Sequence, residues 1–225
     1  MLLSYTEENY LKAILKLSGS KGINVSTNEI AEELETKASS VTDMIRKLSE
    51  KALCHYVKYQ GTRLTEEGRL MAINVVRKHR LWEVFLVNKL QFSWDEVHDV
   101  AEQLEHIKSK QLMERLYAFL GEPEFDPHGN PIPDLHGNFP MRSSEQLIEI
   151  EQDTTCVVLG VTQDNPDFLK YLNKIDVKIG VMITVLDHND FDGSMDLLVY
   201  NEKIHVSAEV AKSIMVKKQE KIGDQ

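Results

Sequence analysis

A proline-rich segment divides the chain into two parts with different apolar patterns. Residues 122–140, EPEFDPHGNPIPDLHGNFP, hold five of the chain's six prolines. Proline lacks a backbone donor and fixes its own backbone angle, so this stretch is expected to be a loop or linker. Apolar residues before it recur at helical spacing, whereas those after it fall in short runs typical of strands. We therefore expect a helical first part and a strand-rich last third.

The first 64 residues are expected to form a winged helix. Ser26 and Glu29 form a capping box at the start of the second of three apolar-periodic segments, and the connector ETKA separates it from the third. A basic hairpin, CHYVKYQGTRL, follows directly. Two short helices, a tight connector and a hairpin match winged helix-turn-helix spacing, the alternative being a three-helix unit with a solvated basic side. The predicted helices are residues 6–18, 26–34 and 39–53.

The charge distribution favours a nucleic-acid partner at one place only. The net charge is −10, but residues 36–64 carry six basic and two acidic side chains, whereas residues 65–225 carry 17 basic and 28 acidic ones. A local basic patch can bind a phosphate backbone while the acidic remainder discourages indiscriminate binding. Hydroxyls and lysines there fix phosphate register, although Ser39 and Ser40 have helix capping as an alternative. The candidates for DNA contact are Thr36, Lys37, Ser39, Ser40, Thr42, Arg46 and Lys47, with Lys58 and Arg63 on the wing.

Residues 65–90 are expected to form one long helix whose apolar seam contains His79 and Glu83. An isolated ionised carboxylate on a buried seam costs several kcal/mol, so Glu83 needs a partner. Arg80, Lys78 or local water could supply it. The alternative is a cation bound by His79 and Glu83, which lie one turn apart.

The stretch SWDEVHDVAEQLEHI, residues 93–107, predicts a second helix with a polar stripe, and its capping box places the start at Ser93. At 100° per residue the stripe fills about a quarter of the circumference, so it either holds a metal ion or faces water. A further helix, SKQLMERLYAFLG, follows, and the three long helices offer apolar seams for a dimer interface. The stripe consists of His98, Glu102, Glu105 and His106.

The last third predicts a small β-barrel of roughly 75 residues, with one short helix at PDFLKYLNK. The two cysteines, Cys54 and Cys156, lie far apart and have no CxxC partner, which excludes a disulfide framework and a thiolate zinc site. A basic segment followed by an apolar run is absent from the start, and no apolar stretch approaches a membrane span. We interpret the protein as cytoplasmic, with no membrane partner.

In this order, VVRKHRLWEVFL, VHDVAEQLEHI and DPHGNPIP resemble the metal-dependent transcriptional regulators of the diphtheria toxin repressor family, in particular their manganese-responsive, three-domain branch. The likeness covers nearly the whole chain. It implies a mainly α fold with a small β domain: a winged-helix DNA-binding domain (1–64), a helical metal-binding and dimerisation domain with the linker (65–140), and an SH3-like, FeoA-like domain (141–225). It also implies a homodimer that binds operator DNA when loaded with Mn²⁺ or Fe²⁺, rather than an enzyme with a small-molecule substrate.

The resemblance divides the metal-ligand candidates between two sites. Carboxylates and imidazoles without thiolate suit Mn²⁺ or Fe²⁺. Manganese-responsive members usually have an aspartate where this chain has Asn9, and position 12, acidic in one arrangement, is Lys12. An amide brings no charge and an ammonium opposes a cation, which favours the second site. The activating site would comprise Asn9, Glu102, Glu105 and His106; the second would comprise His79, Glu83 and His98, with Asp164 and Asp167 as the nearest third-domain matches and Asp126 where some members have a cysteine.

Two rival functions remain open. A metallohydrolase could use the histidine and glutamate set, but the chain contains neither HExxH nor a nucleophile elbow. A metal-independent winged-helix regulator is the other rival, and it predicts operator binding that a chelator leaves unchanged.

Overall fold

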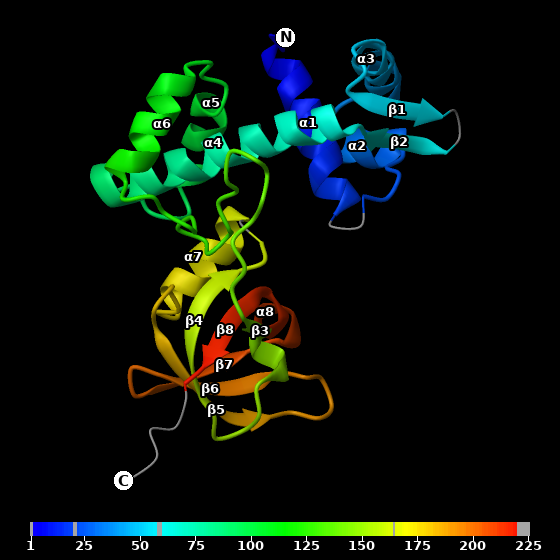
Figure 1. The fold of residues 1–225 in the computed structure, drawn as a ribbon. Coiled ribbons are helices and arrows are strands. Elements are labelled where there is room, and N and C mark those ends of the chain that lie inside the picture. The colour runs from blue at the N-terminus through cyan, green and yellow to red at the C-terminus, as the bar shows by residue number, and fades with distance from the viewer. Residues whose placement is uncertain (1, 20–21, 58–59, 164, 220–225) are drawn as a thin grey trace.

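The computed structural model describes residues 2–19, 22–57, 60–163 and 165–219. Two helical units lie side by side, one at each end of a long helix, and a β domain lies below them (Figure 1). The mainly α fold with a small C-terminal β domain is confirmed. None of the helices in the described ranges combines the length and apolar character that a bilayer span requires.

The N-terminal unit is the predicted winged helix. Its elements are α1 (Tyr5–Ser18), α2 (Thr27–Glu33), α3 (Ala38–Glu50), β1 (Cys54–Val57) and β2 (Gly61–Leu64). The capping box at Ser26 and Glu29 is present, and Thr62 exchanges two backbone hydrogen bonds with Val25, which ties the wing to the segment before α2. Large apolar side chains from all three helices are fully buried together: Leu11, Ile14, Ile30, Ile45 and Leu48.

Helix α4 (Glu66–Leu90) belongs to two hydrophobic cores. Ala72, near its start, packs with the winged-helix core, whereas Leu81 and Leu86 pack with α5 (Val97–Leu104) and α6 (Lys110–Phe119). Thr65 caps it by accepting a hydrogen bond from the Gly68 N–H. Because a helix transmits displacement along its length, α4 joins the two helical units mechanically.

Helix α5 is shorter than its sequence pattern predicts. The prediction that it begins at Ser93 is wrong: residues 94–96 form a turn, and Glu105 follows the last helical residue. The turn is held by the β domain instead, since Trp94 Nε1 donates to Asn173 Oδ1 (2.8 Å) and Asn173 Nδ2 donates to Asp95 Oδ1 (3.1 Å). These tertiary contacts outweigh the local capping preference of Ser93.

The β domain is a six-stranded antiparallel sheet with the order β3-β8-β4-β5-β6-β7. The helix before β8 is not predicted, and the β8 sequence IMVKK shows little alternation on its own. Pairing of β8 with β3 on one side and β4 on the other supplies what the pattern lacks. The elements are β3 (Glu145–Gln146), η1 (Leu147–Glu149), β4 (Thr155–Val161), α7 (Pro166–Lys174), β5 (Met182–His188), β6 (Met195–Val199), β7 (Glu202–Val206), α8 (Ala208–Ser213) and β8 (Ile214–Lys218).

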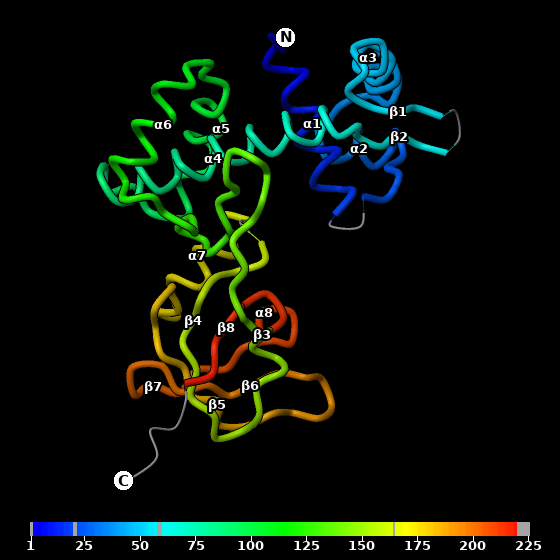
Figure 2. The backbone as a smooth tube through the Cα atoms, in the orientation of Figure 1, coloured from blue at the N-terminus to red at the C-terminus, as the bar shows by residue number. Residues whose placement is uncertain are grey.

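The linker packs closely against β4 of the β domain before the chain reaches β3. Figure 2 shows the backbone after α6 passing beside α4 and then descending to β3. The Val161 N–H donates to the His128 carbonyl (2.9 Å), and Gly129 lies against Leu159 and Gly160 with φ +85°. A Cβ on Gly129 would lie 2.3 Å from the Leu159 oxygen, so only glycine permits this approach.

Replacing Gly129 by alanine is expected to loosen this attachment. The left-handed backbone alone costs alanine about 1–2 kcal/mol, and the contact with Leu159 adds to it. Gly180→Ala is the matched control, because Gly180 has the same φ of +85° but nothing within 4 Å of an added Cβ. Thermal unfolding should show a larger loss for Gly129→Ala than for Gly180→Ala; equal losses would contradict the close-contact explanation.

Candidate metal centre and DNA-binding surface

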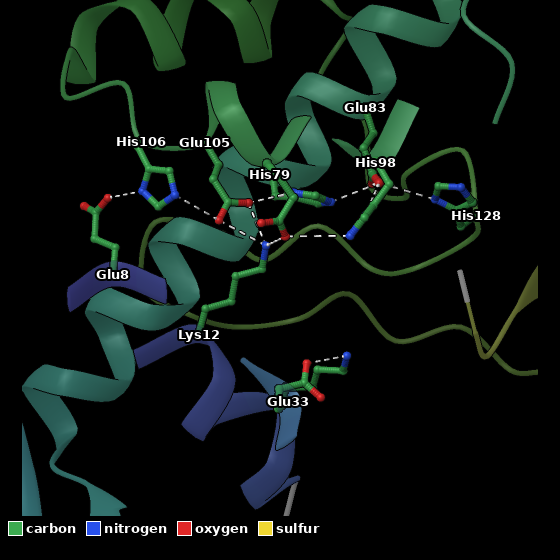
Figure 3. A network of polar contacts seen from close by, with 11 residues as sticks. Glu8, Lys12, Glu33, His79, Glu83, His98, Glu105, His106 and His128 are labelled. Atoms are coloured by element: carbon green, nitrogen blue, oxygen red, sulfur yellow. Dashed lines mark hydrogen bonds and ion pairs between the residues drawn. The ribbon is translucent and has the colours of Figure 1, made fainter. Parts of the chain in front are cut away.

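Three imidazole rings face one buried carboxylate. His79 and Glu83 lie one turn apart on α4, His98 comes from α5, and His128 comes from the linker (Figure 3). Glu83 is 2% exposed, so water screens it little. Within this group, the distances from Glu83 Oε1 are 3.0 Å to His79 Nε2, 3.5 Å to His128 Nδ1 and 3.8 Å to His98 Nδ1.

The pKa values show how strongly these groups interact. Burial raises the pKa of Glu83, but the three nearby imidazoles lower it by more, so its pKa lies well below the ordinary value. Burial lowers the pKa of His79, but Glu105 and Glu83 raise it to about 9. Burial likewise lowers the pKa of His128, and Glu83 and Asp126 raise it to about 9. Without a metal, protons on His79 and His128 therefore balance the buried carboxylate.

Asp126 lies at the edge of the same cluster. One carboxylate oxygen of Glu83, one carboxylate oxygen of Asp126 and one ring nitrogen of His128 lie within 4.8 Å of one another. Burial and repulsion from Glu83 raise the pKa of Asp126 to about 6. Asp126 also shapes the linker, because its Oδ1 accepts hydrogen bonds from the backbone N–H groups of His128 and Asn130. It is thus both a possible ligand and the group that orients His128.

Neither of the two predicted third-domain ligands, Asp164 and Asp167, is found in the described cluster. Asp164 lies outside the described residues. The Asp167 side chain is 95% exposed, its Oδ1 lies 3.9 Å from Lys170 Nζ, and it belongs to none of the described histidine and carboxylate groups that could hold an ion. His128, by contrast, is absent from the predicted ligands. The PHG sequence next to Asp126 was the signal that could have identified it.

The predicted activating site holds an ammonium group. Lys12 Nζ, from α1, lies 2.5 Å from Glu102 Oε1 and 2.7 Å from Glu105 Oε2. Glu105 is fully buried, and its Oε2 also lies 2.6 Å from His79 Nδ1. His79 therefore connects the two predicted sites (Figure 3).

His106 contacts one predicted partner and one residue outside the predicted set, since His106 Nε2 lies 3.5 Å from Glu105 Oε1. His106 Nδ1 lies 2.6 Å from Glu8 Oε2, and Lys108 Nζ lies 2.6 Å from Glu8 Oε1. The Asn9 side-chain oxygen is buried and has no hydrogen-bond partner among the described residues. Glu8, one residue earlier on α1, is a functional candidate that the sequence reasoning missed.

Ligand atoms lie within 4.8 Å of one another in the first cluster and also in the second, at His79, Glu102 and Glu105, but an ammonium group occupies the second. In the first, the His128 Nδ1 is buried, makes no hydrogen bond within the described chain, and faces an anionic oxygen that two further imidazoles share. Three nitrogens and carboxylate oxygens are a donor set that Mn²⁺ or Fe²⁺ accepts. In the second, Lys12 already contacts the oxygens that a metal would need.

The predicted DNA-contact residues gather on and beside α3. Most of the described ones are exposed: Thr36, Lys37, Ser39, Ser40, Arg46, Lys47 and Arg63. Thr42 is half-buried and donates to the Ala38 carbonyl, and Lys47 Nζ lies 3.1 Å from Glu7 Oε1. Lys58 lies outside the described residues. Residues 36–47 and Arg63 therefore expose hydroxyls and basic groups on the winged helix.

A winged helix joined by α4 to a buried histidine and carboxylate cluster defines a DNA-binding protein with an ion-sensing helical domain. Three family profiles match in the corresponding order. Residues 2–62 match the N-terminal DNA binding domain of iron dependent repressors, residues 65–134 match their metal binding and dimerisation domain, and residues 146–218 match the FeoA domain.

Three known proteins are similar to this chain over nearly its full length. The iron-dependent repressor IdeR of Mycobacterium leprae is 29% identical over 95% of this chain and 97% of its own. A manganese-dependent transcriptional repressor solved with manganese is 35% identical, with a TM-score of 0.82 over 95% of this chain and all of that one. The manganese regulator SloR is 36% identical, with a TM-score of 0.73 over 95% and 98% of the two chains. The chain belongs to the iron-dependent repressor family, which includes the diphtheria toxin repressor.

Metal binding at the Glu83 cluster is expected to release protons. With a pKa of about 9, His79 and His128 are protonated at pH 7.5 in the metal-free protein, whereas a coordinating imidazole must be neutral. About two protons per metal should leave from these residues, and affinity should rise as the pH approaches 9. Titration calorimetry in buffers of different ionisation enthalpy measures the proton count.

Two variants check the assignment. His128→Gln should reduce the proton count by about one, because its proton is then missing. His205→Gln is the control, since His205 is exposed on β7 and pairs with Asp196 away from the cluster. An unchanged count in His128→Gln would show that His128 takes no part.

Proposed function

We propose that this family member is a metal-dependent transcriptional repressor that binds operator DNA as a homodimer when Mn²⁺, or alternatively Fe²⁺, occupies the Glu83 cluster. The observation that carries the proposal is the convergence of three imidazoles from α4, α5 and the linker on one buried carboxylate. The proposed ligands are His79, Glu83, His98 and His128, with Asp126 as a further candidate.

The chain supplies the connection from this cluster to DNA. A bound divalent cation would supply positive charge in place of two protons and hold its ligands at fixed distances. His79 and Glu83 orient the middle of α4, His98 orients α5, and His128 orients the linker. Because the other end of α4 packs into the winged-helix core, the arrangement of the ligands fixes where α3 lies relative to the helical domain. Selection of that arrangement would raise operator affinity.

Exposed apolar side chains support the proposed dimer. Leu90 at the end of α4 is 53% exposed, and Phe119 at the end of α6 is 64% exposed, with Leu112 also exposed on α6. Exposed large apolar side chains on a helical domain are compatible with burial in an interface. A two-fold dimer through this domain would present two winged helices to two half-sites.

The proposed division of labour follows the three family profiles. We assign residues 1–64 to DNA binding, 65–140 to metal binding and dimerisation, and 141–225 to an SH3-like domain that positions the linker. The relatives of this chain are repressors and not enzymes, which argues against the metallohydrolase alternative. We propose the cytoplasm as the site of action, which follows from binding to chromosomal operator DNA.

Removal of the metal is expected to weaken operator binding about 5- to 150-fold, the usual range of coupling between two sites. Fluorescence anisotropy with the protein's own promoter region, in chelator and then with added Mn²⁺ or Fe²⁺, measures the change. Glu83→Ala should abolish the metal response, whereas Glu114→Ala, an exposed glutamate on α6, should retain it. Operator affinity that ignores the chelator would favour the metal-independent regulator.

Substitution of Arg46 tests whether the exposed face of α3 contacts DNA. Arg46→Ala should weaken binding to all sequences and reduce the slope of log K against log salt by about 1 per protomer, or about 2 for the proposed dimer, because one phosphate contact is lost in each half-site. Arg115→Ala removes the same charge from α6 and should leave the slope unchanged. A changed base preference with an unchanged slope would assign Arg46 to base reading instead.

A further inference from the structure

Lys12 is held by three carboxylate oxygens. Its Nζ lies 2.5 Å from Glu102 Oε1 and 3.0 and 2.7 Å from the two oxygens of Glu105. A lysine ammonium has three N–H donors, so these contacts use all of them. A metal ion at these oxygens would need the space that the ammonium fills (Figure 3).

The charges around Lys12 balance without a metal. Three carboxylates lie in the region between α1, α4 and α5, and each contacts an ammonium group. The Glu8 oxygens lie 2.6 Å from Lys108 Nζ and 3.9 Å from Lys78 Nζ, and Glu102 and Glu105 share Lys12. The three acids therefore face three lysines and also two imidazoles, since His79 Nδ1 lies 2.6 Å from Glu105 Oε2 and His106 Nδ1 lies 2.6 Å from Glu8 Oε2. A divalent cation would add positive charge to a place that already holds its counter-charges.

Lys12 also keeps its proton. Burial lowers the pKa of Lys12, but Glu105 and Glu102 raise it by more, so the pKa lies above the ordinary lysine value. Burial raises the pKa of Glu102, while Lys12 lowers it by more. Each partner thus stabilises the charged form of the other.

We propose that the Lys12 ammonium is the resident cation of this second cluster, so that each protomer binds one metal ion, at the Glu83 cluster, instead of two. Lys12 belongs to α1 of the winged helix, whereas Glu102 and Glu105 belong to the helical domain. The salt bridges therefore join the two domains whether or not metal is present. Glu105 connects Lys12 to His79, because its Oε2 also lies 2.6 Å from His79 Nδ1.

The test is the number of Mn²⁺ ions bound by the metal-free full-length protein, counted from the loss of the free Mn²⁺ signal in electron paramagnetic resonance. The wild type should bind one ion per protomer and Lys12→Met two, because the freed carboxylates then need a cation. Lys16→Met is the matched control: Lys16 lies one turn later on α1, pairs with Glu33, and should leave the count at one.

The outcomes separate this proposal from the proposed function on which it rests. Two ions in the wild type, or one in folded Lys12→Met, overturn the role of Lys12. No ion in the wild type but one in Lys12→Met supports Lys12 and overturns metal binding at Glu83. If circular dichroism shows Lys12→Met unfolded, Glu102→Gln replaces it. The count should stay at one, whereas loss of the ion would make Glu102 a ligand and overturn the proposal.

Discussion

The charge of Glu83 is the constraint around which the helical domain is organised. A carboxylate that is 2% exposed must meet positive charge within the protein, and its partners come from three separate segments. One imidazole lies a turn away on α4, one lies on α5, and one lies in the linker. The packing of these segments thus depends on whether protons or a metal ion neutralise Glu83. Under the proposed function, this structural requirement for neutralisation would also let the protein respond to a cation.

His79 extends that dependence toward DNA. Its two ring nitrogens contact different carboxylates, Nε2 with Glu83 and Nδ1 with Glu105. Because Glu105 also binds Lys12, an unbroken series of polar contacts leads from the Glu83 cluster to α1 of the winged helix. A hydrogen bond from the second nitrogen of a metal-binding imidazole to a carboxylate fixes its tautomer and ring orientation. The same contact would make the position of α1 sensitive to the state of the cluster.

Periodicity predicted the helices of the first 120 residues and placed His79 and Glu83 on one apolar seam. The free-energy cost of burying an ionised carboxylate then predicted that Glu83 has a partner. The pattern could not show that Trp94 would bind Asn173 and shorten α5, because that contact spans 79 residues. His128 was missed as a ligand since its position depends on how the linker packs on β4. Lys12 was recognised as unfavourable for a metal, but its direct contact with Glu102 and Glu105 needed the packing of α1 on α4. Local rules thus located the clusters, and long-range packing decided their membership.

The contact between Gly129 and β4 gives the β domain a share in the metal centre. Two positions without side chains, Gly129 and Gly160, let the linker backbone touch the strand, and the His128 carbonyl is then fixed by the Val161 N–H. The ring of His128 projects from this anchored backbone toward Glu83. A proposed ligand of the helical domain is therefore held in place by another domain. The presence of the β domain is consequently a condition for the complete set of nitrogens, and the protein's selectivity for ions can evolve through changes in a strand that touches no ion.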